Sequence, residues 1–315
     1  MKKYLVKRIL SVIPILFIVS LVVFFLIHMT PGDPARVMLG DEATEEEVYA
    51  LREQLGFNNP LPVQYVDWIL GIFRGDFGTS FFMQGSMKSI LMEHIKPTLY
   101  LTIYAIIIAV GVAIPLGLAA AKHRGRWADS FVTGFSLLGI SIPAFLTGIL
   151  LMLLFGSKLR WFPTAGYKEP TDNFLKFIKY LTLPAISLGL MQVGLITRVT
   201  RSAALEVMNS DYIKMAKAKG VKGLRLMTLH VLHSCILPIL TVIGQSMILL
   251  LSGATVTETI FNIPGLGQLV MNCIERRDYE VIQAVVLLIA VINVFVMLLV
   301  DILSSFLDPR VRMED

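Results

Sequence analysis

Long apolar runs alternate with short polar segments along the whole chain. Six of these runs cover residues 9–29, 97–121, 131–155, 180–197, 236–257 and 282–306. An α-helix needs about 20 mainly apolar residues to cross the hydrocarbon core of a bilayer, and only the fourth run is short of that length. The pattern therefore predicts an all-α integral membrane protein with six transmembrane helices and a long loop outside the membrane between the first two.

The charged residues are sorted between these runs in the way that lipid requires. None of the 28 Lys and Arg residues lies inside a run, and Asp301 is the one acid among 23 that does. A charge at the bilayer centre costs at least about 2.5–3.5 kcal/mol. Charged residues make up only 16% of the chain, against about 25% in soluble domains. We therefore expect one integral membrane domain.

The distribution of basic residues predicts the orientation. With the N-terminus inside the cell, 16 Lys and Arg fall in 64 inside residues and 12 in 115 outside residues. This bias follows the positive-inside rule and places both termini in the cytoplasm, although five basic residues in the outside segment 156–179 run against it. The net charge of +5 is then explained by loops near anionic lipid, and nucleic-acid binding is not expected.

The outside loop of residues 30–96 is acidic and contains local order. Thr44 and Glu47 form a capping-box pattern that predicts a helix ending near Gly56. A second amphipathic stretch follows Pro62. Anchoring of the loop at the membrane interface is the favoured interpretation of this stretch, and a docking surface for an extracytoplasmic partner is the alternative.

The inside segment 198–235 carries seven Lys and Arg residues and is predicted to contain a short helix. Asp211 is expected to cap a helix over residues 212–219, and Gly220 suits the left-handed position that ends it. Ala216 and Ala218 are small, so a facing protein surface could approach this helix closely. A second basic helical stretch covers residues 224–233.

Several single residues have both an ordinary and a functional interpretation. Pro115 and Pro143 are candidate helix bends, although proline is generally frequent in membrane helices. Asp301 is expected to pair with a cation or mark the membrane boundary rather than to relay protons. His230 and His233 lack the further ligands that a metal site needs. Cys235 and Cys273 fall on opposite sides of the membrane, which excludes a disulfide between them.

The sequence offers no sign of catalysis. It contains no phosphate-binding loop, no glycine-rich dinucleotide motif and no nucleophile–base arrangement. We therefore expect no catalytic, cofactor-binding or metal-binding residues on this chain. If ATP drives the protein, another chain must bind it.

The short inside helix resembles a known element. Asp211, Tyr212, Ile213, Ala216, Lys219 and Gly220 match the loop Asp/Glu-Tyr-Val/Ile-x-x-Ala-x-x-Lys-Gly of peptide-type ABC permeases. The chain departs from the general pattern of type I importers. Lys214 and Met215 replace its glutamate and first alanine, and Pro238 lies five residues farther along than that pattern requires.

Other segments are similar to the same branch, in the same order along the chain. They are Pro31-Gly32-Asp33-Pro34-Ala35, Gly75-Asp76-Phe77-Gly78-Thr79-Ser80, Gly139-Ile140-Ser141-Ile142-Pro143-Ala144-Phe145, Phe261-Asn262-Ile263-Pro264-Gly265-Leu266-Gly267, Arg277-Asp278-Tyr279 and Leu307-Asp308-Pro309-Arg310-Val311-Arg312. Together they cover nearly the whole length. The chain resembles the first, B-type permease of the dipeptide, oligopeptide, glutathione and nickel ABC importers.

The resemblance implies a fold, a location and a set of partners. The fold is that of a type I ABC importer permease in the inner membrane of a bacterium or archaeon. Residues 1–96 would form the first helix and the outside loop, 97–306 the core, and 307–315 a cytoplasmic tail. The partners would be a second homologous permease, two ATPase subunits that bind ATP and Mg²⁺, an extracytoplasmic binding protein and membrane lipid.

The resemblance also assigns a role to the inside helix. Asp211, Tyr212, Ala216, Ala218, Lys219 and Gly220 would couple this chain to an ATPase, while the residues that line the substrate pathway stay undefined. The solute would be a small peptide, glutathione or chelated nickel. Two alternatives remain open at this point: a secondary transporter or channel that needs no ATPase, and a membrane-embedded enzyme.

Overall fold

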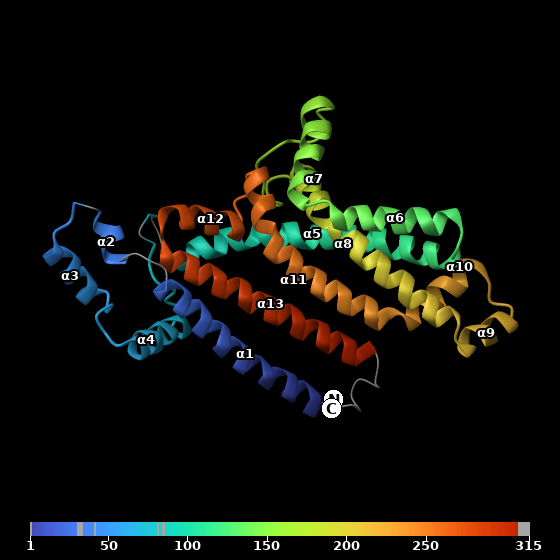
Figure 1. Ribbon diagram of the computed structural model, residues 1–315, viewed down its shortest axis with the longest axis horizontal. Coiled ribbons are helices and arrows are strands. Elements are labelled where there is room, and N and C mark those ends of the chain that lie inside the picture. The colour runs from blue at the N-terminus through green and yellow to red at the C-terminus, as the bar shows by residue number, and fades with distance from the viewer. Residues whose placement is uncertain (1, 30–33, 41, 81, 84–85, 308–315) are drawn as a thin grey trace.

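The computed structural model describes residues 2–29, 34–40, 42–80, 82–83 and 86–307, and every regular element in these ranges is helical (Figure 1). The motif residues 31–33 and 308–312 lie outside the described residues. The elements are α1 (Lys2–His28), α2 (Pro34–Leu39), α3 (Glu45–Gln54), α4 (Leu61–Phe73), α5 (Met87–Lys122), α6 (Trp127–Ser141), α7 (Ala144–Leu151), the π-helical η1 (Met152–Lys158), α8 (Phe174–Met208), α9 (Asp211–Ala218), α10 (Gly223–Arg225), the π-helical η2 (Leu226–Leu232), α11 (Ile236–Phe261), α12 (Leu266–Arg276) and α13 (Tyr279–Leu307).

The centre of the molecule is a bundle of long helices in which α8 packs against α5, α6, α7 and α11. Two glycines of this bundle stand where neighbouring backbones approach closely. A Cβ on Gly117 of α5 would lie 2.7 Å from the Thr200 Cβ of α8, and one on Gly194 of α8 would lie 2.5 Å from the Ser136 carbonyl oxygen of α6. Small residues at such crossings are typical of membrane helices, which associate through close packing.

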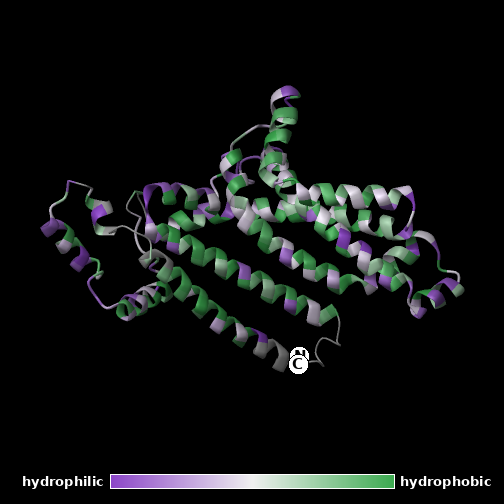
Figure 2. Ribbon diagram, in the orientation of Figure 1, coloured by the Kyte–Doolittle hydropathy of each residue, from purple (hydrophilic) through white to green (hydrophobic). Residues whose placement is uncertain are grey.

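Five of the predicted spans are confirmed as long apolar helices: α1, α5, α8, α11 and α13. Figure 2 shows hydrophobic residues along their length and hydrophilic residues at α3 and α9. The predicted limits of the fourth span, 180–197, were wrong, because α8 is 35 residues long and continues to Met208. Arg198 and Arg201 therefore lie within a helix instead of opening a loop.

The third predicted span, 131–155, is not one continuous helix. The chain bends by 100° between α6 and the segment 144–158, which we call the α7–η1 arm. Pro143 has no N–H for the helical ladder, and the preceding Ile142 is extended at φ −90° and ψ 122°. The start of the arm still packs on α8 and α11, and its far end projects from the bundle (Figure 1). Pro115, by contrast, lies inside an unbroken α5.

The helices α3 and α4, outside the bundle, form where the sequence predicts them. The capping box of α3 is confirmed, because the Glu47 N–H donates to Thr44 Oγ1 and the Thr44 N–H donates to Glu47 Oε2. The amphipathic stretch forms α4, which packs on α1. Tyr65 reaches Phe24 at 5.4 Å between ring centroids, and its hydroxyl lies 2.7 Å from the Ser20 hydroxyl. The first span thus holds α4 in place.

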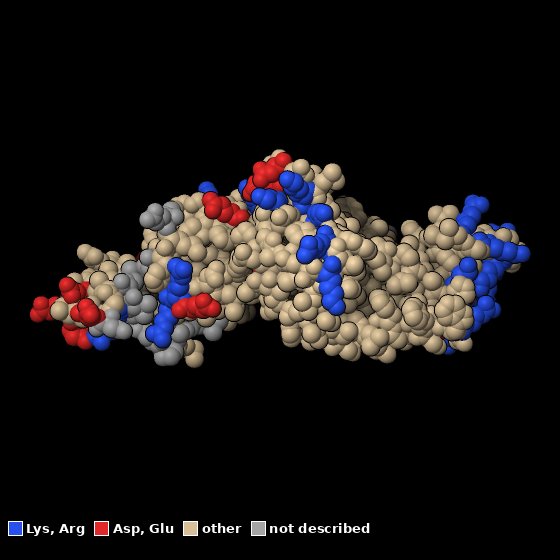
Figure 3. Space-filling model, turned by 90° about the horizontal axis from the view of Figure 1, so that it is seen from above, with Lys and Arg blue, Asp and Glu red and all other residues tan. Residues whose placement is uncertain are grey.

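The two ends of the molecule differ in charge. Figure 3 shows Lys and Arg gathered at the end that carries α9 and acids at the end that carries α3. The expected pairing of Asp301 is confirmed, because its Oδ2 lies 3.0 Å from Arg8 Nη1 and so links α13 to α1. The predicted domain boundary at residue 96 falls within the continuous α5, and the division into domains stays a prediction.

Candidate functional site

The helix α9 lies at the basic end of the molecule and begins differently from the expectation. Ser210 occupies the N-cap position with extended backbone, and Asp211 is the first helical residue. The prediction that Asp211 caps the helix was therefore wrong. Its carboxylate is exposed and accepts from Lys214 Nζ at 2.8 Å, and a negative charge in the first turn also suits the helix dipole.

The other end of α9 is closed by Gly220, as predicted. Its φ is +87°, in the left-handed region that favours glycine. The Gly220 N–H donates to the Lys217 carbonyl at 2.9 Å, and the Val221 N–H donates to the Ala216 carbonyl at 3.1 Å. These two bonds form a Schellman motif. A Cβ on Gly220 would meet no atom within 4 Å, so conformation and not crowding selects glycine here.

One face of α9 is buried in its own chain. Ile213 is fully buried and Ala216 nearly so. They share a hydrophobic cluster with residues at the ends of three long helices and with η2, namely Leu118, Ala121, Ala204, Leu226, Met227, Val231, Cys235 and Ile239. The small size of Ala216 therefore serves packing within this chain, whereas Ala218 is exposed, as a partner-facing residue would be. Through this cluster α9 is fixed to the ends of α5, α8 and α11.

The aromatic residue of α9 is held by η2. The Tyr212 hydroxyl lies 2.7 Å from His230 Nδ1, and the two rings are 5.7 Å apart. His230 thus positions Tyr212. Among the residues that the structure describes, no group of three or more His, Cys, Asp and Glu side chains could hold a metal ion.

The outward side of this region is apolar with a basic margin. Tyr212 is 49% exposed and Met215 54% exposed, and Leu224 and Leu229 nearby are also exposed. We call these four residues the outward face. Lys214, Lys219 and Lys222, which are close to them in the sequence, are exposed as well. Exposed apolar side chains interspersed with charges are typical of a protein interaction site.

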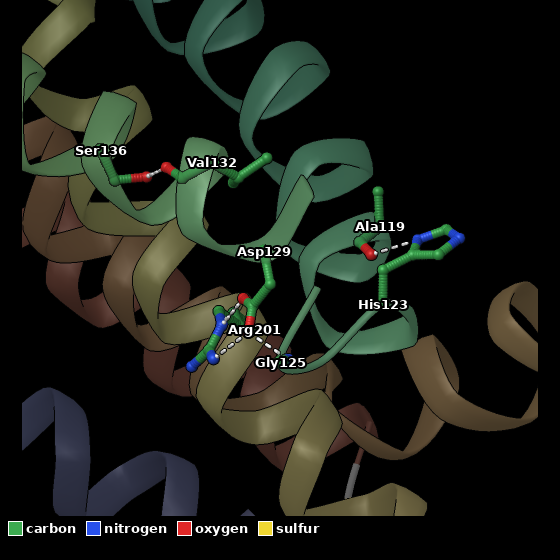
Figure 4. A network of polar contacts seen from close by, with 7 residues as sticks. All are labelled: Ala119, His123, Gly125, Asp129, Val132, Ser136 and Arg201. Carbon is green, nitrogen blue, oxygen red and sulfur yellow. Dashed lines mark hydrogen bonds and ion pairs between the residues drawn. The ribbon is translucent and has the colours of Figure 1, made fainter. Parts of the chain in front are cut away.

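A partly buried ion pair fixes the neighbouring turn between α5 and α6 (Figure 4). Asp129, in the first turn of α6, accepts from Arg201 Nε at 2.5 Å and Nη2 at 2.8 Å. It also accepts from the Gly125 N–H at 3.0 Å. Sequence reasoning missed this pair, because its members are 72 residues apart. The only local signal was a single acid in a basic loop.

Near the C-terminal end of α11, Glu258 is fully buried beside the start of α12. It accepts from Thr98 Oγ1 at 2.6 Å and from the N–H groups of Gly267 and Gln268 at 2.8 and 3.1 Å. A Cβ on Gly265 would collide with the Glu258 carboxylate. Gly265 therefore has no side chain because its backbone lies directly against a carboxylate, whereas a Cβ on Gly267 would collide with Thr255. Sequence reasoning missed Glu258.

Two further segments singled out in the sequence meet in space near α12. Ser80 Oγ donates to Asp278 Oδ2 at 2.6 Å, and the Thr79 N–H donates to Glu280 Oε2 at 2.7 Å. A Cβ on Gly78 would collide with the Glu280 carboxylate. Residues 75–80 are thereby fixed to the start of α13.

The helix α11 carries an exposed polar stripe inside a membrane span. Thr241, Gln245, Ser252 and Thr259 are exposed and lie on one face. In the described part of the chain, the Gln245 and Ser252 side chains make no hydrogen bond, whereas Thr241 and Thr259 bond to carbonyls of their own helix. Polar groups at this depth face water-filled cavities or other protein rather than lipid.

Comparison with known proteins adds independent evidence. Residues 113–313 match the sequence model of the family described as "binding-protein-dependent transport system inner membrane component", and residues 1–102 match the N-terminal model of such membrane components. The chain is 38% identical over 309 residues to a probable peptide ABC transporter permease of Sinorhizobium fredii, covering 98% of this chain and 99% of that protein.

Two further relatives are similar over the same length. A putative peptide transport system permease of Brucella abortus and the glutathione transport system permease GsiC of Salmonella typhimurium are each 39% identical over 312 residues, covering 99% of both chains. Among solved structures, a chain of the inward-facing MetNI methionine ABC transporter matches with a TM-score of 0.60 at 15% identity, covering 72% of this chain and 100% of that one. This match shows the fold.

Proposed function

The chain belongs to the family of binding-protein-dependent transport system inner membrane components, and from that premise we propose that it carries small peptides, including glutathione, in partnership with a second permease. It is a multi-pass inner-membrane permease subunit of an ABC importer. It is non-catalytic, and ATP and Mg²⁺ act on a separate ATPase chain. These properties are shared by the family. The solute, the pairing with a second permease and the residues that couple to the ATPase are our proposals.

The position of α9 carries the coupling proposal. Its inward residues Ile213 and Ala216 join it to the ends of three long helices, while Tyr212 and Met215 lie on the outward face. We propose that the outward face binds a groove of the ATPase subunit, with Asp211, Ala218 and Lys219 at its edge and Gly220 ending the helix. Closure of the ATPases would then displace α9 and the helix ends together, because core packing is stiff and transmits strain.

The proposed partners are a second homologous permease, two ATPase subunits and an extracytoplasmic binding protein. The α7–η1 arm supports the pairing of two permeases, since it leaves the bundle and exposes Leu150 and Leu153. The outside helices α3 and α4 provide surface for the binding protein. Membrane lipid would cover the remaining apolar sides of the spans.

The names of the relatives favour peptides and glutathione as the solute over a nickel chelate. We propose that the polar stripe of α11 lines the pathway, with the Gln245 amide and Ser252 hydroxyl offering hydrogen bonds to a peptide backbone. A lipid-facing position for Gln245 would leave its amide unpaired, which costs several kcal/mol.

Uptake and co-purification together test the function. In a strain lacking this chain, restored uptake of a radiolabelled dipeptide and of glutathione should require the ATPase genes. Met215→Asp should reduce ATPase co-purification, whereas Lys168→Asp in the outside loop should not. Uptake that persists without any ATPase would favour the secondary-transporter alternative and overturn the proposal.

Thiol labelling tests the pathway. A cysteine at Gln245 should react with a water-soluble thiol reagent and be protected by transported peptide. A cysteine at Ile107, exposed on the apolar face of α5, should not react. Equal resistance at both positions in the assembled importer would place the α11 stripe against protein and exclude it from the pathway.

A further inference from the structure

A cavity of about 480 Å³ lies at the basic end, between the α5–α6 turn, the end of α8 and one flank of α9. Four cations line it: Lys122, Arg124, Arg126 and Lys217. Leu205, Met208 and Ala121 add apolar surface, and Asn209 adds an amide. Its volume falls in the range of about 300–1,000 Å³ that small-ligand sites occupy.

The positive charge of the cavity is not cancelled by the acids around it. Asp129 is the closest acid on the turn, and Arg201 and the Gly125 N–H already occupy its carboxylate. Glu206 on α8 is exposed to solvent and does not line the cavity. In the part of the chain that the structure describes, none of the four lining cations forms an ion pair. The Asp129–Arg201 pair thus fixes the wall of the cavity, and Arg124 interacts with Asp129 only at longer range. The four cations therefore still have room for a direct contact with an anion.

The cavity lies where the membrane ends. The span α5 stops at Lys122, and α6 begins with Trp127, which is 81% exposed and is followed by Phe131, 67% exposed. Exposed aromatic side chains at the end of a span mark the level of the lipid headgroups. Basic pockets between transmembrane helices on the cytoplasmic side bind anionic headgroups.

We propose that this cavity binds the phosphate headgroup of an anionic phospholipid from the cytoplasmic leaflet. Lys122, Arg124 and Arg126 hold the phosphate from the α5–α6 turn, and Lys217 holds it from α9. Leu205 and Met208 contact the apolar start of the lipid. The bound headgroup thereby joins α9 to the turn. The binding does not depend on the proposed function, whereas its effect on coupling does.

The position of Lys217 favours lipid over an acidic segment of an ATPase. On an α-helix, Lys217 and Tyr212 lie on opposite flanks of the inward residues Ile213 and Ala216. The cavity is therefore on the flank away from the contact between Tyr212 and His230. A groove that receives the outward face leaves this flank beside the membrane surface.

The test uses the intact importer, purified with its partner chains and freed of loosely bound lipid. The variant is Lys122→Gln/Arg124→Gln/Lys217→Gln, and the matched control is Lys168→Gln/Lys176→Gln/Lys179→Gln, three exposed cations outside this region. Native mass spectrometry should show one anionic phospholipid fewer per copy in the variant and no loss in the control. Since each cation near an anionic surface contributes about 1 kcal/mol, affinity for phosphatidylglycerol should fall roughly 100-fold.

A second measurement uses only the unaltered complex. Short-chain phosphatidylglycerol should raise its melting temperature, while short-chain phosphatidylcholine and inorganic phosphate should not. Equal stabilisation by inorganic phosphate would identify a free-anion site and overturn the lipid proposal. So would unchanged lipid retention in the variant. Loss of the ATPase subunits from the variant with lipid retention intact would assign the cavity to the ATPase and likewise overturn it.

Discussion

Replacing Ile213 by alanine should detach α9 from the bundle while leaving the spans folded. Ile213 is fully buried, and the change removes three carbon atoms at about 0.8 kcal/mol each, or about 2.4 kcal/mol before any cavity cost. Comparable substitutions cost about 2–5 kcal/mol. A helix of eight residues is far below the roughly 12–15 residues needed for stability alone. The loss should therefore appear as local opening of α9.

Hydrogen exchange measures this opening directly. A loss of about 2.4 kcal/mol corresponds to roughly 50-fold faster exchange at the amides of α9, with α5, α8 and α11 unchanged. Uptake per ATP hydrolysed should fall, because a detached α9 no longer moves the helix ends.

The matched control is Met215→Ala on the outward face of the same helix. Alanine favours helix at least as well as methionine, so exchange of α9 should stay slow while binding of the ATPase weakens. Unchanged exchange in Ile213→Ala, or equally fast exchange in both variants, would show that burial of Ile213 does not anchor α9.

Further outcomes are expected for Gly220, for the two cysteines and for Gly265. Gly220→Ala should destabilise the end of α9 by about 1–2 kcal/mol, because alanine is strained in the left-handed backbone at this position. Hydrogen exchange of the last turn of α9 should then be faster. Gly220→Glu should abolish uptake while membrane insertion stays normal. Burial, reinforced by neighbouring acids, raises the thiol pKa of both Cys235 and Cys273 to about 11. Because the reactive thiolate forms only as the pH approaches that value, a maleimide should label neither cysteine at pH 7.5 unless the protein is unfolded. Gly265→Ala should reduce thermal stability and transport because its Cβ collides with Glu258, whereas Gly111→Ala, in open space, should not.

The features that the sequence predicted well are local ones. The capping box of Thr44 and Glu47 spans four residues, and the Gly220 stop depends on the backbone of one residue, so both follow from nearest neighbours. Five spans were recognisable because lipid demands a long apolar surface. The apolar run marks only the lipid-covered part of a helix, which is why α8 extends well beyond its predicted end into the cluster around Ala204.

Other features depend on contacts that only the folded chain creates. Pro143 marks a break in its own neighbourhood, but the 100° angle between α6 and the α7–η1 arm is found only in the folded chain, where α7 packs on α8 and α11. The partners of Asp129 and Glu258 lie 72 and 160 residues away. The sequence also did not show that Ala216 faces the interior of the chain, because a small residue suits both a partner surface and a crowded interior.

The ion pair between Arg8 and Asp301 has a consequence for how the protein is made. Besides the aromatic contact with α4, the first span packs mainly on α13. The ribosome adds the 293 residues that separate the paired side chains in roughly 15–60 s, at about 5–20 residues per second. During that interval α1 lies in the bilayer without α13, the helix on which it mainly packs. Assembly of this subunit is complete only when a late-arriving helix closes onto the earliest one.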